Sequence, residues 1–136
     1  DESECLGEIT RFQKRAQLLP LMLAGYWQDG PIEVTGTDWL TLPADYGVPA
    51  TLRGFNLIEV TDERLAERIA QSEEVEAHSP EEVELRAATI VAGGVLYSEL
   101  AQSSASGVSI PELDFYLWSR RNEVDVPTHR TLTTAY

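Results

Sequence analysis

The chain has 136 residues, of which 43% are hydrophobic, which is enough for one compact domain and too little for two ordinary ones. Ten Lys and Arg residues stand against 23 Asp and Glu residues, so the net charge is -13 and the pI is near 4.4. A surface with that charge repels a nucleic-acid backbone, which excludes broad nucleic-acid binding. A small phosphorylated ligand stays open, because one local basic pocket can oppose the overall field.

The single cysteine and the short apolar runs bear on the cellular compartment, on metal binding and on membrane segments. Cys5 has no partner for an internal disulfide and no histidine or cysteine cluster near it, so we expect a reduced, cytoplasmic protein without a metal or other cofactor. The apolar runs at 18–27 and 88–97 are about ten residues long, whereas a membrane helix needs roughly 20. We therefore expect no membrane segment, and the first residues lack the pattern of a signal peptide.

Helical periodicity begins near residue 10 and continues to residue 27. Apolar residues recur there at the spacing of one helix face, and Pro20 should kink or break the helix. A turn-rich connector follows, and Pro49 then fits the first turn of a short helix that Gly54 would close. The predicted face of the first helix consists of Phe12, Ala16, Leu19 and Leu23.

Three later stretches carry helix start signals. At 61–74, Thr61 is a plausible cap for an amphipathic helix with Leu65 and Ile69 on its apolar side. At 79–100 and 109–121, capping boxes with an adjacent proline precede helices that we expect to be buried. The boxes are Ser79 with Glu82 and Ser109 with Glu112; the predicted faces are Val83, Ala87, Ile90, Val91 and Val95 in the first helix, and Ile110, Leu113 and Leu117 in the second.

The helix at 79–100 contains Gly93 and Gly94, each of which costs about 1 kcal/mol relative to alanine, so we expect a side chain to pack against the backbone there. Strand signals are weak, since only 32–34 and 57–60 alternate at all. The predicted fold class is all-α, with a single compact helical domain over residues 1–136.

Polar side chains embedded in apolar segments are the candidates for a functional site, because the common phosphate-loop, dinucleotide, metalloprotease and hydrolase motifs are missing from the sequence. Asp45 lies in an apolar turn and is either a cap for backbone amides or a charge held for chemistry. Lys14 either extends its ammonium to water or serves the site. Asp114, if buried, needs a partner for its carboxylate whether or not it acts on a substrate. Glu82 and Arg86 are spaced as a helical i,i+4 ion pair. His78 and His129 lack metal-ligand spacing.

Five segments, taken in order, resemble the C-terminal half of the queuosine salvage protein family. They are FQKRAQLL at 12–19, DWLTLPADYGVPATLR at 38–53, SPEEVELRAATI at 79–90, LDFYLW at 113–118 and HRTLTTAY at 129–136. The resemblance implies an all-helical fold similar to helix-hairpin-helix DNA glycosylases. It also implies hydrolysis of the N-glycosidic bond of queuosine 5'-phosphate, or a related 7-deazaguanine nucleotide, releasing queuine for salvage into tRNA.

The resemblance also implies roles for single residues. Asp45 matches the catalytic aspartate of the family's Ala-Asp-Tyr motif, and Lys14 matches the lysine of its Lys-Arg-Ala-Gln motif. A carboxylate could stabilise the positive charge that develops on the ribose or orient the attacking water, while the lysine could pair with that carboxylate or face the phosphate. The expected substrate-binding residues are Tyr46, Asp38, Arg15, Gln17, Asp114, Tyr116, Trp118, His129 and Arg130, with the three aromatics as candidates to stack on the base or to serve as plain core.

Two departures from the family pattern leave an alternative open. Gly47 stands where the family usually has an arginine, and the family's N-terminal half, which helps wall the substrate pocket, has no counterpart in this sequence. Either the chain is a fragment of a longer protein, or a second chain or self-association completes the pocket. The alternative function is a non-catalytic module that binds a nucleoside or assembles with a protein and keeps the scaffold without the activity.

Overall fold

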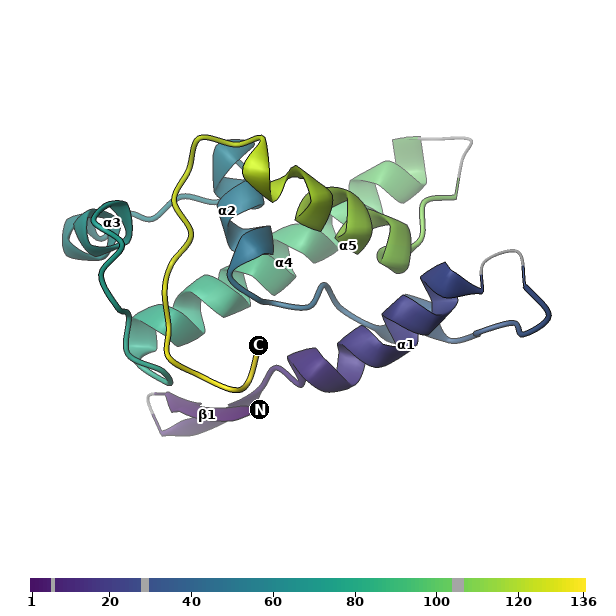
Figure 1. Ribbon diagram of the computed structural model, residues 1–136, viewed down its shortest axis with the longest axis horizontal. Coiled ribbons are helices and arrows are strands. Elements are labelled where there is room, and N and C mark those ends of the chain that lie inside the picture. Colours follow the sequence, from purple (N-terminus) through teal and green to yellow (C-terminus); the bar gives the residue numbers. More distant parts are fainter. Residues whose placement is uncertain (6, 28–29, 104–106) are drawn as a thin grey trace.

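A computed structural model describes residues 1–5, 7–27, 30–103 and 107–136, and helices dominate it (Figure 1). The long helix α4 crosses the molecule behind α2 and α5, while α1 and α3 lie toward opposite ends. In chain order the elements are β1 (Glu2–Cys5), β2 (Glu8–Arg11), α1 (Lys14–Tyr26), η1 (Thr37–Trp39), α2 (Gly47–Gly54), α3 (Glu63–Ala70), α4 (Pro80–Ser103), α5 (Ile110–Ser119) and η2 (Arg120–Asn122). Within the described ranges, no helix is both long and apolar enough to cross a membrane.

A two-stranded antiparallel sheet at the start of the chain corrects the all-α prediction. Strands β1 and β2 pair with Glu2 opposite Arg11 and Cys5 opposite Glu8. The pairing escaped the sequence reading because the buried position is polar: Ser3 is buried, and its hydroxyl lies 2.8 Å from Nδ1 of His78. Alternation of apolar and polar residues, which normally reveals a strand, is missing from these residues.

Helix α1 differs from its prediction in start, break and buried face. It begins at Lys14, after Gln13 with a left-handed φ of 52°, and it continues through Pro20 without a break. Phe12 is buried but precedes the helix, so it does not set the helical phase. The buried position of α1 is Leu21, whereas Leu19 is exposed.

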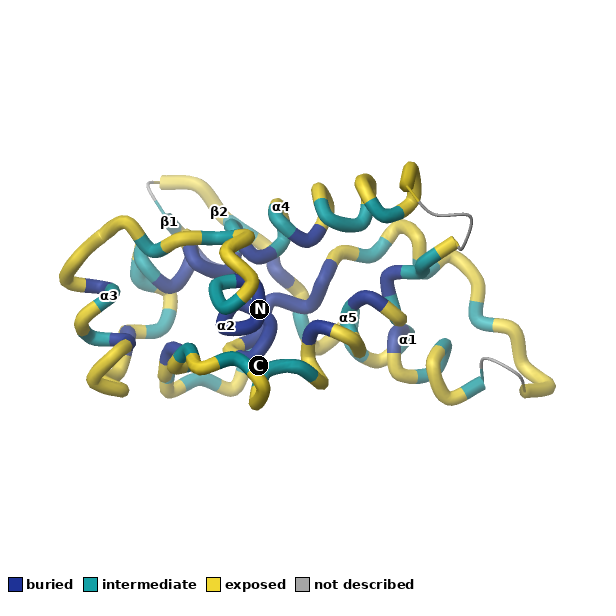
Figure 2. Tube along the Cα trace, turned by 90° about the horizontal axis from the view of Figure 1, so that it is seen from above, coloured by how far each residue is buried: buried dark blue, intermediate teal, exposed yellow. Residues whose placement is uncertain are grey.

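Helices α2, α3 and α5 follow their predicted limits closely. Helix α2 ends at Gly54 and has Pro49 inside its first turn. Helix α3 is capped by Asp62, whose Oδ1 accepts a hydrogen bond from the Leu65 amide at 2.8 Å, rather than by Thr61. The capping box of α5 is present as predicted. Together α2 and α5 supply most of one core cluster, which consists of Leu42, Val48, Leu52, Leu113 and Leu117. Figure 2 shows buried segments at α2 and along part of α5.

Helix α4 starts where the capping box predicted, but a different face is buried. The Ser79 hydroxyl accepts the amide of Glu82 at 3.3 Å, while Val91 and Val95 are exposed. The buried positions include charged and polar residues that satisfy one another, which a hydrophobic pattern cannot reveal. They are Glu82, Val83, Leu85, Arg86, Thr89 and Gly93.

The two glycines of α4 have different surroundings. A Cβ built on Gly93 would stand 2.2 Å from Cδ1 of Leu42, so the predicted close packing against the backbone is confirmed at that position. A Cβ on Gly94 would meet nothing within 4 Å. The side chain of Leu42 therefore occupies the space that Gly93 leaves free, three residues before Asp45.

Candidate functional site

Asp45 ends a buried turn that leads into α2. Its side chain is 5% exposed, and its Oδ1 accepts hydrogen bonds from the amides of Gly47 at 2.8 Å and Val48 at 2.9 Å. Those amides belong to the first turn of α2 and would otherwise lack acceptors. One carboxylate oxygen therefore caps the helix, as the simpler interpretation proposed, while the other oxygen is free of backbone contacts in the described structure.

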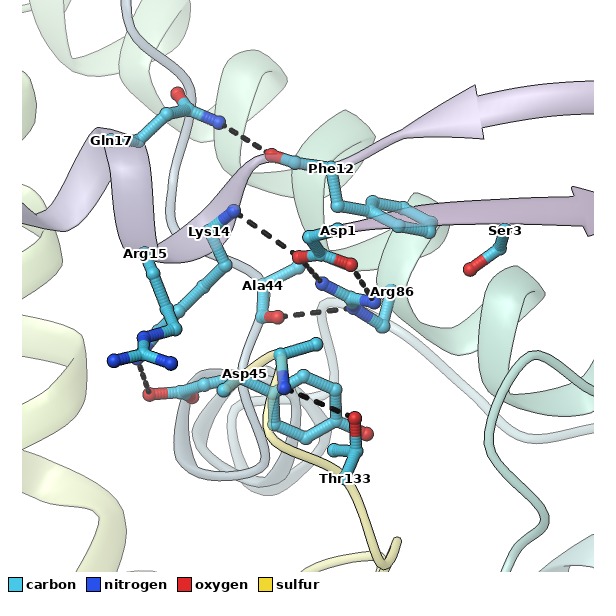
Figure 3. Close-up of polar contacts among 12 residues, drawn as sticks. Asp1, Ser3, Phe12, Lys14, Arg15, Gln17, Ala44, Asp45, Arg86 and Thr133 are labelled. Carbon is cyan, nitrogen blue, oxygen red and sulfur yellow. Dashed lines mark hydrogen bonds and ion pairs between the residues drawn. The ribbon is translucent and has the colours of Figure 1, made fainter.

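The second oxygen of Asp45 faces Lys14 at the start of α1. The Lys14 Nζ lies 3.9 Å from Asp45 Oδ2, and the two side chains are only 12% and 6% exposed. The lysine thus does not simply extend its ammonium into water. Figure 3 shows Lys14 at the start of α1 and Asp45 in the turn before α2. Low exposure strengthens their attraction relative to the same pair on a surface.

Asp114 on α5 belongs to the same group of charges. Burial and, second to it, the negative charge of Asp45 raise the pKa of its carboxyl to about 7, while Lys14 opposes the change. Residues from α1, from the turn before α2 and from α5, far apart in sequence, therefore interact electrostatically. Two carboxyl groups in different environments beside one ammonium form a plausible acid–base arrangement.

Aromatic side chains border this cluster at partly exposed positions. Trp118 is 40% exposed, and its Cδ1 lies 3.7 Å from the point where a Cβ on Gly47 would stand. Tyr46 and Tyr116 are 44% and 48% exposed, so neither ring is plain core. The Trp118 ring beside the turn offers flat apolar surface that suits stacking on a base, whereas the Tyr116 ring lies 5.1 Å from the guanidinium carbon of Arg120.

Two polar residues hold the turn in place. The Gln17 side chain accepts hydrogen bonds from the Thr41 amide at 2.8 Å and hydroxyl at 3.1 Å, and it donates to the Phe12 carbonyl at 2.9 Å. Arg86 donates through Nε to the Ala44 carbonyl at 3.2 Å (Figure 3). Both side chains thus use their polar groups on the protein itself.

Arg86 is fully buried, and its charge is balanced on several sides. It pairs with Asp1 at 2.6 Å and with Glu82 at 3.3 Å, which confirms the predicted i,i+4 pair in a buried setting. Its guanidinium lies 4.0 Å from the ring centre of Phe12 and 4.6 Å from that of Tyr136. Burial lowers the pKa of Arg86, while Glu82 counters that effect.

The remaining predicted site residues bind other parts of the chain or solvent. His129 is buried and shares a 3.2 Å hydrogen bond with the Tyr136 hydroxyl; burial, followed by the charges of Arg53 and Arg86, lowers its pKa to about 4. Arg130 donates to the Ser72 carbonyl at 3.3 Å, Arg15 donates to the Thr134 carbonyl at 3.1 Å, and Asp38 is exposed in η1. These hydrogen bonds of His129, Arg130 and Arg15 are all with residues other than Asp45.

The comparison with known proteins gives these residues a family context. The whole chain, residues 1–136, matches the family model described as queuosine salvage protein. The chain belongs to the queuosine salvage protein family. A curated relative from Sphaerobacter thermophilus, named queuosine 5'-phosphate N-glycosylase/hydrolase, is 38% identical to this family member over 136 residues. The match covers 96% of this chain and 41% of the relative, so the chain spans about two fifths of the relative's length.

Two hollows of this queuosine salvage family member are lined by residues outside the cluster. One of about 620 Å³ is bordered by Gln13, Arg15 and Thr134, and another of about 90 Å³ lies between α3 and α4. Asp45, Lys14 and Asp114 line neither of these two hollows. Within the described ranges no group of three or more His, Cys, Asp or Glu residues could hold a metal ion.

The sequence interpretation of this family member missed one residue beside the turn. Arg121 follows α5 in η2, and its Cδ lies 3.1 Å from the point where a Cβ on Gly47 would stand. In the sequence, Arg121 is simply the last residue of the helix predicted at 109–121. The arginine pair after LDFYLW gave no sign that one of the two side chains would return to the Asp45 turn.

Proposed function

We propose that this chain hydrolyses the N-glycosidic bond of queuosine 5'-phosphate or a related 7-deazaguanine nucleotide, releasing the free base. The observation that carries the proposal is the cluster of Lys14, Asp45 and Asp114. The name of the 38% identical relative supports the choice of substrate. A likeness to helix-hairpin-helix DNA glycosylases, a cytoplasmic location and the absence of direct nucleic-acid binding remain parts of this proposal.

Asp45 has the features needed to stabilise the sugar during cleavage. Breaking the bond between the base and C1' leaves positive charge on the ribose, and a fixed carboxylate in a water-poor setting stabilises that charge. Oδ1 is held by two amides of α2, so the carboxylate is already oriented before substrate binds. Oδ2, on the side of Lys14, is then the oxygen that acts on the sugar or on the attacking water.

Asp114 is suited to move the proton that the reaction requires. The departing base takes the electron pair of the glycosidic bond and leaves more easily if it gains a proton. A carboxyl with a pKa of about 7 still holds a proton near neutral pH and can donate it. Water then adds its oxygen to C1', and its released proton restores Asp114, so that atoms and charge balance over one turnover.

The decisive experiment measures free base by chromatography after incubation of the purified chain with queuosine 5'-phosphate. Asp45→Asn keeps an oxygen that can accept the two α2 amides but removes the negative charge, so the fold should persist and base release should fall by about 100-fold or more. Asp62→Asn is the matched control, because Asp62 caps α3 in the same way outside the cluster. Equal turnover in the two variants would remove Asp45 from the mechanism.

A non-catalytic assembly module is the second candidate, and one observation favours it. Helix α1 exposes an apolar stripe in which Leu19 is 62%, Met22 63% and Tyr26 81% exposed. Side chains of this kind on one face commonly mark a contact surface. The expected result for such a module, whether it binds a nucleoside, a second protein or its own copy, is saturable binding with no base released at any protein concentration.

A further inference from the structure

Arg121, which follows α5, lies beside the Asp45 turn at Gly47. The point where a Cβ on Gly47 would stand is 3.1 Å from Cδ of Arg121 and 3.6 Å from Oδ1 of Asp45. Because Gly47 has no side chain, the stem of Arg121 passes directly beside the first turn of α2. The stem of Arg121 and the candidate catalytic carboxylate of Asp45 thus both border Gly47.

The guanidinium of Arg121 is held in a defined plane. Its central carbon lies 3.7 Å from the ring centre of Trp118, and its Nη1 donates to the Trp118 carbonyl at 3.2 Å. Stacking on the indole ring fixes the plane of the guanidinium, and the N–H groups at the edge of that plane remain able to donate hydrogen bonds to a ligand. The arginine is therefore ordered before any ligand arrives.

Among the described residues, Arg121 lacks the carboxylate partner that several other cations of the chain have. Lys14 pairs with Asp45, Arg86 with Asp1 and Glu82, and Arg120 with Glu123 at 2.6 Å. In the part of the chain that the structure describes, Arg121 forms no ion pair with a carboxylate. A half-buried guanidinium without a counterion, in a protein of charge -13, is suited to bind an anion from solution.

We propose that Arg121 binds the phosphate of a nucleoside 5'-monophosphate whose ribose lies over Asp45. This inference rests on the proposed function, since it uses the same sugar position. In a nucleoside 5'-phosphate the phosphate and C1' lie on different sides of one sugar ring, so one ligand can reach two separate groups of the same site. Asp45 and the stem of Arg121 both border Gly47, and the guanidinium of Arg121 lies over Trp118. Guanidinium groups bind phosphate through two parallel hydrogen bonds, which explains why arginine suits this place.

The test compares Arg121→Gln with Arg120→Gln, the adjacent arginine whose charge Glu123 already balances. The measured quantity is kcat/KM for queuosine 5'-phosphate and for unphosphorylated queuosine. Arg121→Gln should lower the value for the phosphorylated substrate by about 10- to 100-fold and leave that for queuosine nearly unchanged. Arg120→Gln should change neither. An equal loss on both substrates in Arg121→Gln, or no loss on either, would overturn the assignment.

A binding measurement separates this inference from the proposed reaction. Calorimetric titration of the full chain carrying Asp45→Asn, with queuosine 5'-phosphate and then queuosine, should show tighter binding of the phosphorylated ligand. Adding Arg121→Gln should abolish that preference. If the unmodified chain releases no base but the preference exists and depends on Arg121, the reaction fails and the phosphate site stands. A phosphate preference that is absent, or that survives the loss of Arg121, refutes the phosphate site.

Discussion

Gly93→Ala should destabilise the protein although alanine is the better helix former. The new Cβ would lie 2.2 Å from Cδ1 and 2.8 Å from Cγ of Leu42, whereas carbon atoms normally meet at about 3.5 to 4.0 Å. Leu42 is 1% exposed and packs with Val48, Leu52 and Leu113, so it cannot move without disturbing the core. Overpacking of this kind costs up to about 3 kcal/mol. Helix propensity returns about 1 kcal/mol, so a net loss near 2 kcal/mol is expected.

Gly94→Ala provides the matched control, one residue further along the same helix. Its Cβ would meet nothing within 4 Å, so only the helix propensity changes and the variant should gain about 0.5 to 1 kcal/mol. Urea unfolding measures both free energies of unfolding, and the two variants should move the midpoint in opposite directions. If Gly93→Ala were as stable as Gly94→Ala, the close packing of Leu42 against α4 would be refuted.

The same pair of variants tests whether α4 positions the site. Leu42 lies three residues before Asp45, so a displaced Leu42 should also displace the carboxylate from the amides of Gly47 and Val48. Under conditions where both variants are fully folded, Gly93→Ala should release base about 10-fold more slowly, because small misplacements of a reacting group are costly. Unchanged turnover in folded Gly93→Ala would show that the turn is positioned independently of α4.

Four further predictions concern charge and capping. Asp114 has a raised pKa, so its contribution to the free energy of unfolding should fall as pH rises from about 4 to about 7. The difference in unfolding free energy between the unmodified chain and Asp114→Asn, measured by urea unfolding, should fall across that range, and a constant difference would contradict the prediction. His129 has a lowered pKa of about 4, so it contributes the opposite trend up to its ordinary value of 6.5, which the same measurement should show lost in His129→Gln. Arg86→Lys should lower the free energy of unfolding by about 2 kcal/mol, because lysine lacks the planar guanidinium that bonds to Ala44 and stacks on Phe12. Ser109→Ala should lower it by about 1 kcal/mol, because the N-terminal cap of α5 is lost. Thermal midpoints measured at pH 7 would detect both losses.

Local signals in the sequence predicted where two of the helices begin and end. Helices α2 and α5 begin and end close to their predicted limits, because proline, glycine and a capping box act within a few residues. The buried face of α4 was predicted wrongly, since Arg86 and Glu82 satisfy each other in the interior and leave Val91 in solvent. Hydrophobic periodicity cannot distinguish a buried ion pair from a solvated one.

The candidate site shows the same limit of sequence reasoning. The motif around Asp45 identified a candidate catalytic carboxylate, and the motif at Lys14 supplied a cation that the structure brings within 3.9 Å of it. The electrostatic influence of Asp45 on Asp114 depends on the packing of α5, which no spacing along the chain encodes. Arg121 comes into the site for a similar reason, because it needs the missing side chain of Gly47 and the ring of Trp118 at the same place.

Arg86 also bears on the order in which the protein can assemble during folding. It fixes the Ala44 carbonyl, and it is itself fixed by Asp1, which lies 85 residues earlier, and by the ring of Tyr136. Contacts between residues so distant in the chain form late in folding, because a long loop must close first. The position of the Ala44 carbonyl, next to Asp45, thus depends on contacts between segments that lie far apart in the sequence. The surroundings of Asp45 should therefore be completed late in folding, after the local helices have formed.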